Sequence, residues 1–545
     1  MSIDRDDIQT VALLVDETQC ADILDSLLNR NAKPGGRKPT VDSKSFLFLF
    51  WLSGRVYKSY CVTSMLKTLK ALPAEVLLER GMSRKWKAST LYNYTKRLHA
   101  AIDYTELRAP HTAENERIWR HDRLDDIVHA QLRYTWYRDP SDPAIFAIDA
   151  TAVPSPELIR RKPKGEPVAP SRQIDEGCPD IISLPPENEE ELMRVINPET
   201  ATGKRGAKGP SDGSWSGKTC TTGRQESEWF FGYYAHAISS TPVTKSGADR
   251  VQVAFFSLTT AKGDVVEPSL RAIDRVLRHN DIEHLAADRL YSNLKYDRWW
   301  KKLDERGIQQ VLDLRSDQQG FTDYDGHLIA AAWPHCPATP PELGTIASLP
   351  PQPTHQQRED YTSKVNARFS YAAKPKELFK AGSGRWICPA RVEKVGCSIR
   401  GEESIQIARE KGLPIIENPP PEDLQPAMCK NGDVTFRANK PAQKTLFKVS
   451  QRFYWGSEDW QDHYRLRGCI ERFFGYAKKH QGLQRDAHAF RGLGMATLIT
   501  AAIFANANIN KLRLWAQNEE NPPDHPLLFT LTAEEEGESE LGYAA

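Results

Sequence analysis

The sequence lacks the features that mark secreted and membrane-spanning proteins. Its 9 cysteines in 545 residues are too sparse for a disulfide scaffold, so we expect reduced thiols. No charged segment followed by an apolar one stands at its start, so no secretory signal is expected. The most apolar stretch, Phe46–Leu52, is much shorter than the roughly 20 residues of a membrane span. These absences favour a cytoplasmic protein without a membrane partner.

The chain also lacks a strong net charge, but its charges are unevenly distributed. The formal net charge is only +1, which by itself argues against a polyanion as partner. Yet residues 30–70 contain nine Lys or Arg and one acid, and residues 84–97 contain five Lys or Arg and no acid. After Arg513 there are eight acidic residues and neither Lys nor Arg. Basic regions followed by an acidic tail favour a polyanion such as DNA.

The length of the chain predicts several domains, because 545 residues exceed what one hydrophobic core holds. Hydrophobic periodicity, Pro and Gly clusters and charge divide the chain into successive parts. They are a helical DNA-binding domain (1–115), the first part of an α/β core (135–316) with a basic insertion (155–228), a β-rich insertion (317–452), the C-terminal helices of the core (453–515) and an acidic disordered tail (516–545). The basic insertion could contact DNA or be disordered, and the β-rich insertion could equally be a dimer surface.

A helix near the N-terminus has the side chains of a DNA reader. The stretch STLYNYTKRLHAAID has the apolar spacing of a helix, with Ser89 as its N-cap. Its outward face would carry Lys96 and Arg97. Short helices with basic and aromatic exposed side chains are what a helix-turn-helix protein presents to a DNA groove. A solvated helical bundle would show the same pattern.

Two acidic residues occupy unusual places in the predicted α/β core. Asp149 interrupts the apolar strand AIFAIDATAVP, where a carboxylate is costly unless it is paired or ligates a metal. Asp288 ends the strand in EHLAADRLYS, and in α/β sheets functional sites form at the carboxyl ends of strands. Around these two strands the pattern predicts three strands, a helix, a strand, a helix and a strand, which is a mixed α/β core.

A third acid, Glu471, stands alone in the basic helix YRLRGCIERFFGYAKKHQGLQR, which contains six Lys or Arg. A salt-bridged surface glutamate is the ordinary explanation. Together with the two strand acids, however, Glu471 would form an oxygen cage for Mg²⁺, which prefers carboxylates, water and phosphate oxygens. Two such ions activate the attacking oxygen and stabilise the leaving oxygen in phosphoryl transfer.

Two other motifs give weaker signals. SGKT at Ser216–Thr219 is similar to a phosphate-binding loop, but Asp212 stands where that motif requires Gly and no strand precedes it, so we reject an ATP site. Four thiols and a histidine in the β-rich insertion could hold a structural zinc ion: Cys336, Cys388, Cys397, Cys429 and His335. No CxxC pair is present among them, so ordinary buried thiols explain them more simply.

The order and spacing of the acids resemble those of the DDE transposases of bacterial insertion sequences. In one branch of that family the last motif is Tyr, two residues, Arg, three residues, Glu, six residues and Lys. Every spacing is met in this sequence, by Tyr464, Arg467, Glu471 and Lys478. The Asp-Arg-x-Tyr motif of the same branch is met by DRLY at Asp288–Tyr291. One departure is Tyr234 in FFGYYAH, where the family usually has Lys. The resemblance covers about residues 144–514.

The resemblance implies a ribonuclease H-like α/β core with a β-rich insertion. It implies that Asp149, Asp288 and Glu471 are the catalytic residues and ligate two Mg²⁺ or Mn²⁺ ions. The phosphates beside the scissile bond would be bound by Tyr464, Arg467 and Lys478, with help from Arg289 and Tyr291. In relatives a Trp of the insertion stacks on a flipped base, and both Trp333 and Trp386 are candidates here. The implied partners are double-stranded DNA and a second copy of the chain, in the nucleoid of a bacterial cytoplasm.

We therefore expect a cut-and-paste transposase that cleaves DNA at terminal inverted repeats and joins the freed 3′-hydroxyl to target DNA. Excision through a hairpin end and direct transfer are both open. The N-terminal helices would bind the repeats, with phosphate contacts dominating the affinity. Two alternatives are a non-catalytic DNA-binding protein on a transposase scaffold, which would not need all three acids, and a structure-specific nuclease of the same fold.

Overall fold

The computed structural model describes residues 3–30, 39–106, 109, 111–154, 201–205, 228–242, 250–260, 263–324, 326–347, 349–350, 352–483, 490 and 492–529. Of the predicted basic insertion, only β2 (Ala201–Arg205) and Glu228 belong to these residues. The SGKT segment and residues 530–545 of the predicted tail lie outside the described residues.

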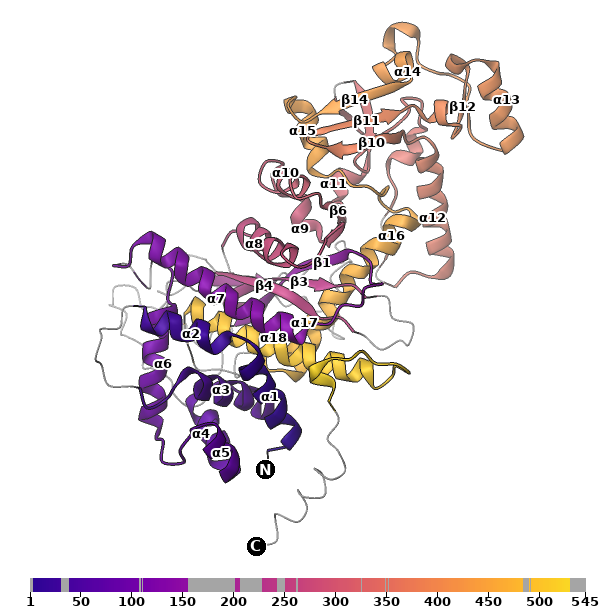
Figure 1. The fold of residues 1–545 in the computed structure, drawn as a ribbon. Coiled ribbons are helices and arrows are strands. Elements are labelled where there is room, and N and C mark those ends of the chain that lie inside the picture. The colour runs from indigo at the N-terminus through magenta and orange to yellow at the C-terminus, as the bar shows by residue number, and fades with distance from the viewer. Residues whose placement is uncertain are drawn as a thin grey trace.

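Helices make up the described chain before the sheet (Figure 1). They are α1 (Arg5–Glu17), α2 (Cys20–Asn29), α3 (Ser43–Tyr57), α4 (Val62–Ala71), α5 (Ala74–Glu79), α6 (Ala88–Ile102) and α7 (Glu114–Thr135). The apolar run Phe46–Leu52 lies in α3 and is buried on all sides, as expected for a helix without a polar face. The predicted cap at Ser89 is wrong: α6 begins at Ala88, so Ser89 lies inside its first turn.

A mixed sheet follows the helices. Its strands are β1 (Ile145–Pro154), β2, β3 (Glu228–Ser240), β4 (Val253–Thr260), β5 (His284–Ala287) and β6 (Gln309–Leu312). The strand order is β2-β3-β1-β5-β6, and β4 also pairs with β3. β1, β5 and β6 are parallel, whereas β3 is antiparallel to β1 and to β4. The predicted mixed α/β core is confirmed.

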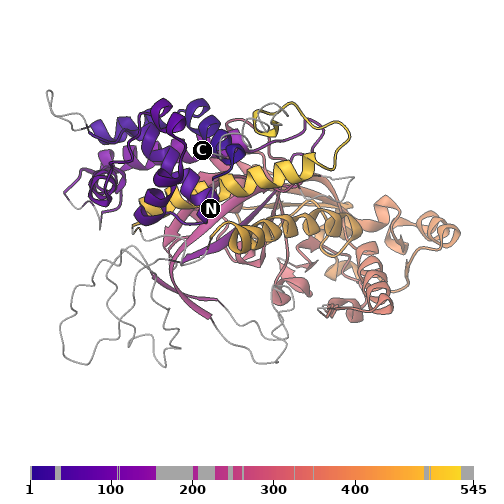
Figure 2. The same ribbon diagram turned by 90° about the horizontal axis from the view of Figure 1, so that it is seen from below.

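Helices connect the strands and cover the sheet. The connections are α8 (Val266–Leu277), α9 (Arg289–Ser292) and α10 (Trp300–Asp304), and the C-terminal elements are α16 (Glu458–Tyr464), the 3₁₀ turn η7 (Arg465–Arg467), α17 (Gly468–His480) and α18 (Leu493–Ala516). α17 contacts β1 and β3, and α18 contacts β4 and α7. Figure 2 shows α17 and α18 lying across the sheet.

One hydrophobic core joins the N-terminal helices to the sheet. Val11 of α1, Phe50 of α3, Phe256 of β4 and Phe504 of α18 belong to the same buried cluster. α18 is the element that makes this possible, because it contacts α3, α6, α7 and β4. The N-terminal helices therefore share their core with the sheet.

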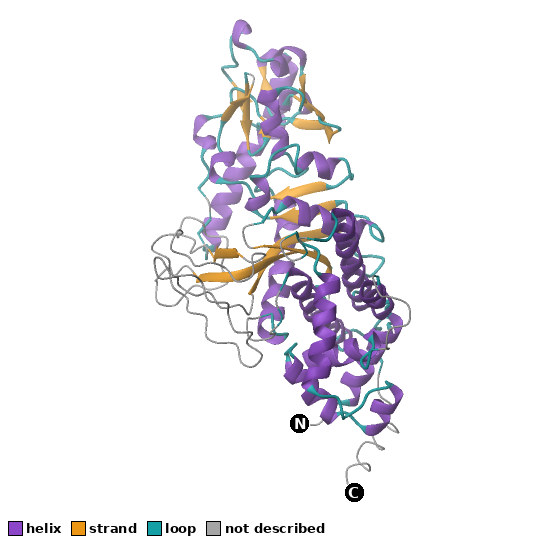
Figure 3. Ribbon diagram, turned by 90° about the vertical axis from the view of Figure 1, so that its left-hand side faces the viewer, coloured by secondary structure: helices purple, strands orange, loops and turns teal. Residues whose placement is uncertain are grey.

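The insertion after β6 has a second hydrophobic cluster, which includes Trp333, Trp386 and Phe436 and extends to Trp300 of α10 and Val311 of β6. Its strands are β7 (Thr322–Tyr324), β8 (His327–Ala330), β9 (Trp333–Pro334), β10 (Lys374–Lys380), β11 (Ser383–Ile387), β12 (Gly396–Cys397), β13 (Ile415–Ile416) and β14 (Asp433–Arg437). Its α-helices are α11 (Ser316–Gln319), α12 (His355–Ser370), α13 (Glu402–Lys411), α14 (Ala427–Asn431) and α15 (Pro441–Lys448). Figure 3 shows strands and helices mixed in this region, so the predicted β-rich character holds only in part.

Within the described residues, only α18 is long and apolar enough to cross a membrane. Of its most apolar window, 94% is buried inside the protein. A helix that is apolar on all sides and buried in this way is a core helix.

Candidate active site

The parallel pairing of β1 with β5 brings two of the predicted acids together. The last pair in the register joins Ala147 to Ala286. Asp149 and Asp288 each stand two residues beyond that pair, so both side chains extend from the same face of the sheet. Both are buried, with 4% and 6% of their surface exposed. The parallel register therefore explains why two acids 139 positions apart in the sequence lie side by side.

Glu471 reaches the same place from α17. Arg467 of η7 lies between it and the sheet: one Nη donates to Asp149 Oδ2 at 3.3 Å, and the other donates to Glu471 Oε1 at 2.6 Å. The Arg467 side chain is only 7% exposed and that of Glu471 is 38% exposed. One guanidinium thus connects the strand acid to the helix acid, and Glu471 is not an isolated surface glutamate.

The electrostatics of Asp149 reflect its burial and the neighbouring charges. Burial raises the pKa of Asp149 from 3.8 to about 7; Arg467 opposes this rise, and the charges of Asp288 and Glu471 increase it. Burial works to lower the pKa of Arg467, but its interactions with Tyr464, Asp149, Glu471 and Asp288 raise it overall. The site therefore holds more negative charge than the one buried arginine neutralises.

Asp288 is fixed by the turn that follows its strand. Its side chain is the N-cap of α9 and accepts a hydrogen bond from the Leu290 amide at 2.8 Å. The predicted residue Arg289 donates through Nε to Asp313, which also accepts from Trp455 Nε1 at 3.1 Å. Arg289 is thus held beside the acids by an ion pair.

Asp313 is a buried acid that the sequence analysis missed. It follows β6 directly, and its neighbour in the register is Asp288, because Leu312 pairs with Ala287. The available signal was the same as for Asp288, an acid at the end of an apolar strand. Its bonds to Arg289 and Trp455 assign it to holding this edge together.

Tyr464 and Lys478 flank the acids along the helical segment. The Tyr464 ring stacks on Trp460 with centroids 4.7 Å apart, and the Arg467 guanidinium lies 5.7 Å from its centroid. Burial raises the pKa of Tyr464, so its hydroxyl stays protonated and can donate a hydrogen bond. Lys478 is half-buried, two turns after Glu471. The four motif residues lie along α16, η7 and α17, although the predicted single helix is interrupted at η7.

The other predicted DNA contacts have different surroundings. Tyr291 is 1% exposed, its ring packs at a tilt against Trp299, and its hydroxyl shares a hydrogen bond of 3.1 Å with Ser269. These contacts favour packing over the predicted phosphate contact. Lys96 and Arg97 are exposed on α6, as a DNA-binding role requires. They lie far before Glu471 in the chain. Figure 1 shows their helix, α6, apart from α17, which carries Glu471.

The two tryptophans considered for base stacking are both buried. Trp333 is 5% exposed and Trp386 is 0% exposed, and their rings meet edge to face at 4.8 Å. Trp333 Nε1 also donates to the Gln451 carbonyl at 3.3 Å. In this conformation both rings belong to the core of the insertion, which counts against either of them receiving a base.

The acids suit hard divalent cations by their chemistry. Asp149, Asp288 and Glu471 present only carboxylate oxygens, the ligands that Mg²⁺ and Mn²⁺ prefer. Among the described residues, no three His, Cys, Asp or Glu side chains already have the spacing of a metal site. The Arg467 guanidinium bonds to both Asp149 and Glu471 in this structure. The donor set fits, and Arg467 supplies the positive charge in its present geometry.

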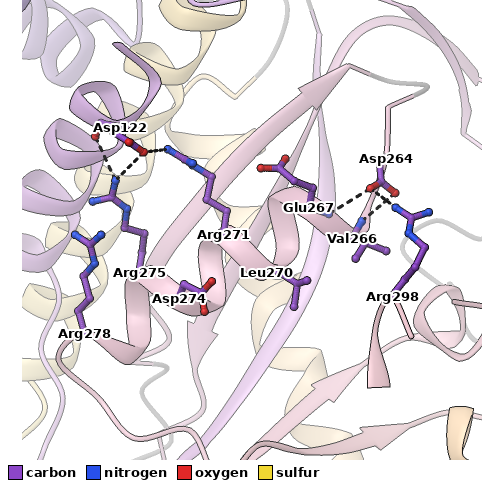
Figure 4. A pocket seen from close by; sticks show the side chains of 10 residues that line it. All are labelled: Asp122, Asp264, Val266, Glu267, Leu270, Arg271, Asp274, Arg275, Arg278 and Arg298. Atoms are coloured by element: carbon purple, nitrogen blue, oxygen red, sulfur yellow. Dashed lines mark hydrogen bonds and ion pairs between the residues drawn. The ribbon is translucent and has the colours of Figure 1, made fainter. Parts of the chain in front are cut away.

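A cavity of about 440 Å³ lies elsewhere, between α7 and α8 (Figure 4). Its lining is charged, but its arginines are already paired: Arg271 binds Asp122 at 2.7 Å and also Asp125, and Arg275 binds Asp126. None of the predicted site residues lines it. We regard it as an ion-paired helix interface and place the candidate active site at the acids.

No protein-family model, no curated protein and no solved structure matches this chain.

Proposed function

We propose that this protein is a DNA transposase that cleaves DNA at transposon ends and joins the freed ends to target DNA. One observation carries the proposal: the β1–β5 register and the Arg467 bridge gather Asp149, Asp288 and Glu471 at one place beside the sheet. These are the three acids selected by the motif spacing in the sequence. A surface glutamate and two unrelated strand acids would have no reason to meet.

The strand arrangement supports a ribonuclease H-like core. Three parallel strands, β1, β5 and β6, adjoin an antiparallel β3, with β4 beyond it. The first acid stands on the central β1, the second follows β5, and the third lies on a helix packed against β1. This is the arrangement that the resemblance to DDE transposases leads us to expect.

The proposed reaction is an in-line displacement at phosphorus. A water oxygen bonds to phosphorus while the 3′ oxygen leaves with a proton, and the resulting 3′-hydroxyl then attacks a second phosphodiester in the same way. When bound, two Mg²⁺ or Mn²⁺ ions would activate the attacking oxygen and stabilise the leaving one. Asp149, Asp288 and Glu471 would hold them, and Arg467 would orient two of these carboxylates.

The remaining residues of the motif would position DNA. Tyr464 is held by its stack on Trp460 and keeps a phenolic donor for a phosphate oxygen. Lys478 would supply a positive charge beside the acids, and Arg289 would do so on the other side. Lys96 and Arg97 on α6 would bind phosphates of the transposon ends, whose contacts fix the register of the protein on the duplex. Pairing of two DNA ends would require a homodimer.

The test compares Asp288→Asn with Asp281→Asn. Asp281 is an exposed acid in the loop before β5, so its variant makes the same chemical change outside the site. Labelled duplexes carrying the inverted repeats that flank the gene are incubated with each protein and Mg²⁺, Mn²⁺ or EDTA. We expect metal-dependent nicking at the repeat boundary, followed by a hairpin or joined product, with wild type and Asp281→Asn. Asp288→Asn should bind the repeats and leave them uncut.

Other outcomes separate the alternatives. Binding of the repeats without cleavage by the wild type would identify a DNA-binding protein that has lost catalysis. Cleavage of branched or flapped DNA without preference for the repeats would identify a structure-specific nuclease. Cleavage that survives in Asp288→Asn would refute the assignment of the acids.

A further inference from the structure

Four cysteines from separate parts of the insertion line one small cavity. Cys336 follows β9, Cys388 follows β11, Cys397 ends β12, and Cys429 lies in α14. The cavity has a volume of about 10 Å³, the space of about one water-sized probe. Each of these cysteines is free and only 5–6% exposed. The fold thus gathers four of the cysteines in the chain around a space that holds a single small atom.

The thiols are close enough to influence one another. Burial raises the pKa of Cys336 to about 12, and the charges of Cys429, Cys388 and Cys397 add to that rise. Burial likewise raises the pKa of Cys429 to about 11, with contributions from Cys388 and Cys397. All four sulfurs therefore belong to one electrostatic cluster.

Polar groups surround the sulfurs. The backbone amide of Ala338 works to lower the pKa of Cys336, and the amides of Ile399 and Arg400 work to lower that of Cys397, against the larger effect of burial. Amides placed in this way favour the thiolate, which is the form that binds metal. The Arg400 guanidinium, which donates to the Met428 and Cys429 carbonyls, lines the same cavity and supplies positive charge.

His335, the fifth candidate from the sequence, does not belong to the cluster. Its Nδ1 lies 2.9 Å from the Trp333 carbonyl and its Nε2 lies 3.1 Å from the Tyr454 hydroxyl. Both ring nitrogens are therefore engaged in the core, and the set around the cavity is four thiols.

From this geometry we propose that Cys336, Cys388, Cys397 and Cys429 form a structural tetrathiolate zinc site. Zn²⁺ takes four ligands tetrahedrally, and a closed set of four thiolates is a structural type of site. The sulfurs are not yet at metal-ligand spacing, since no group of three such ligands is preformed among the described residues. Rotation of the cysteines about χ1 moves each sulfur without moving the backbone, so the ion can close the set.

The segment between Cys388 and Cys429, which we call the lobe, has little hydrophobic core, so a metal ion would stabilise it. Between Cys388 and Cys429 the chain forms strands of two residues, β12 and β13, and short helices, at the far end of the insertion (Figure 1). Few of its side chains are buried and apolar, among them Val395, Ala408 and Ile416. Small units with so little core are usually stabilised by metals or disulfides. The zinc ion would connect this lobe to Cys336 at its base.

The experiment measures zinc in the full-length protein, purified with reductant and washed with EDTA to remove ions from carboxylates. Mass spectrometry of the metal content should give one zinc ion per chain for wild type. Cys388→Ser and Cys397→Ser should lose it. The control Cys61→Ser changes a half-buried thiol that caps α4, where serine is an equally good cap, and should keep the ion.

A second measurement does not depend on whether the variants fold. Wild-type protein produced with Co²⁺ should show the intense thiolate-to-cobalt absorption of a tetrathiolate site, and Asp288→Asn should show it unchanged. This separates the cysteine site from the acids, so the zinc proposal stands or falls independently of the proposed function. Wild-type protein without stoichiometric zinc, with these cysteines either reactive as free thiols or paired as disulfides, would overturn it.

Discussion

Arg467 is a buried cation between two carboxylates, and its removal should lower the stability of the protein. Replacement by the similarly long Met removes the cation that pairs with Asp149 and Glu471. Because breaking a buried ion pair leaves an uncompensated charge, we expect Arg467→Met to lower the free energy of unfolding by about 3–5 kcal/mol. Urea denaturation measures this value. Arg465→Met is the matched control, since Arg465 is exposed two residues earlier and pairs with Asp462 at the surface.

The control should change the free energy of unfolding by less than about 0.5 kcal/mol, because exposed pairs contribute little. Equal, small effects of the two substitutions would show that Arg467 does not hold the acids together in solution.

Asp149 should make the stability of the protein depend on pH. Its folded-state pKa of about 7 lies above the ordinary 3.8, so the native state keeps a proton that the unfolded chain has already lost. The stabilisation from this proton is complete below about pH 4 and is lost as the pH rises through about 7. Asp149→Asn stays neutral throughout. Its stability relative to wild type should therefore increase from pH 5 to pH 8, by on the order of 1 kcal/mol or more.

Urea denaturation at the two pH values in EDTA, which removes any ion that would stabilise the charge, provides the measurement. A relative stability that stays constant, or that falls toward pH 8, would mean that the Asp149 carboxylate is not destabilised by its burial.

Two neighbouring helices, α17 and α18, should respond in opposite ways to the same substitution. A Cβ atom at Gly494 of α18 would lie 2.8 Å from the Ile102 carbonyl oxygen of α6, whereas one at Gly475 of α17 would meet nothing within 4 Å. Gly494→Ala should therefore destabilise the protein by about 1–3 kcal/mol through overpacking. Gly475→Ala should stabilise it by about 0.5–1 kcal/mol through helix propensity. Thermal unfolding of both variants gives the signs, and a stabilising Gly494→Ala would refute the close approach of α6 and α18.

Local sequence patterns predict the helices and strands of the α/β core well. The apolar run around Asp149 predicts β1, and the motif from Tyr464 to Lys478 predicts which side chains share the helical segment. Features that depend on tertiary partners escape such patterns. The sequence predicts that a strand ends at Asp288, but not that Asp288 caps the short helix α9 or that Tyr291 faces the core. The cysteine cluster has no local spacing signal, since its members come together only through folding.

At the scale of the whole molecule, the expected boundary at residue 115 does not divide the hydrophobic core. The sequence shows a helical segment before the strands, and composition alone makes it resemble an independent domain. The structure packs these helices on α18, which follows the last motif residue, Lys478, in the chain. Contacts between the two ends of a chain leave no periodicity in either end, which is why sequence analysis separates what the fold joins.

The two ends of the insertion meet beside β6. Trp455, just after it, bonds to Asp313, just before it, and Trp460 Nε1 donates to the Leu312 carbonyl at 3.0 Å. The chain thus leaves the core after β6 and returns beside the same strand, so the insertion is a long loop whose two ends are bonded together. Doubling the length of such a loop costs only about 0.6 kcal/mol in closure entropy. Evolution can therefore lengthen, shorten or exchange the insertion without altering the strand order or moving the carboxylates beside it.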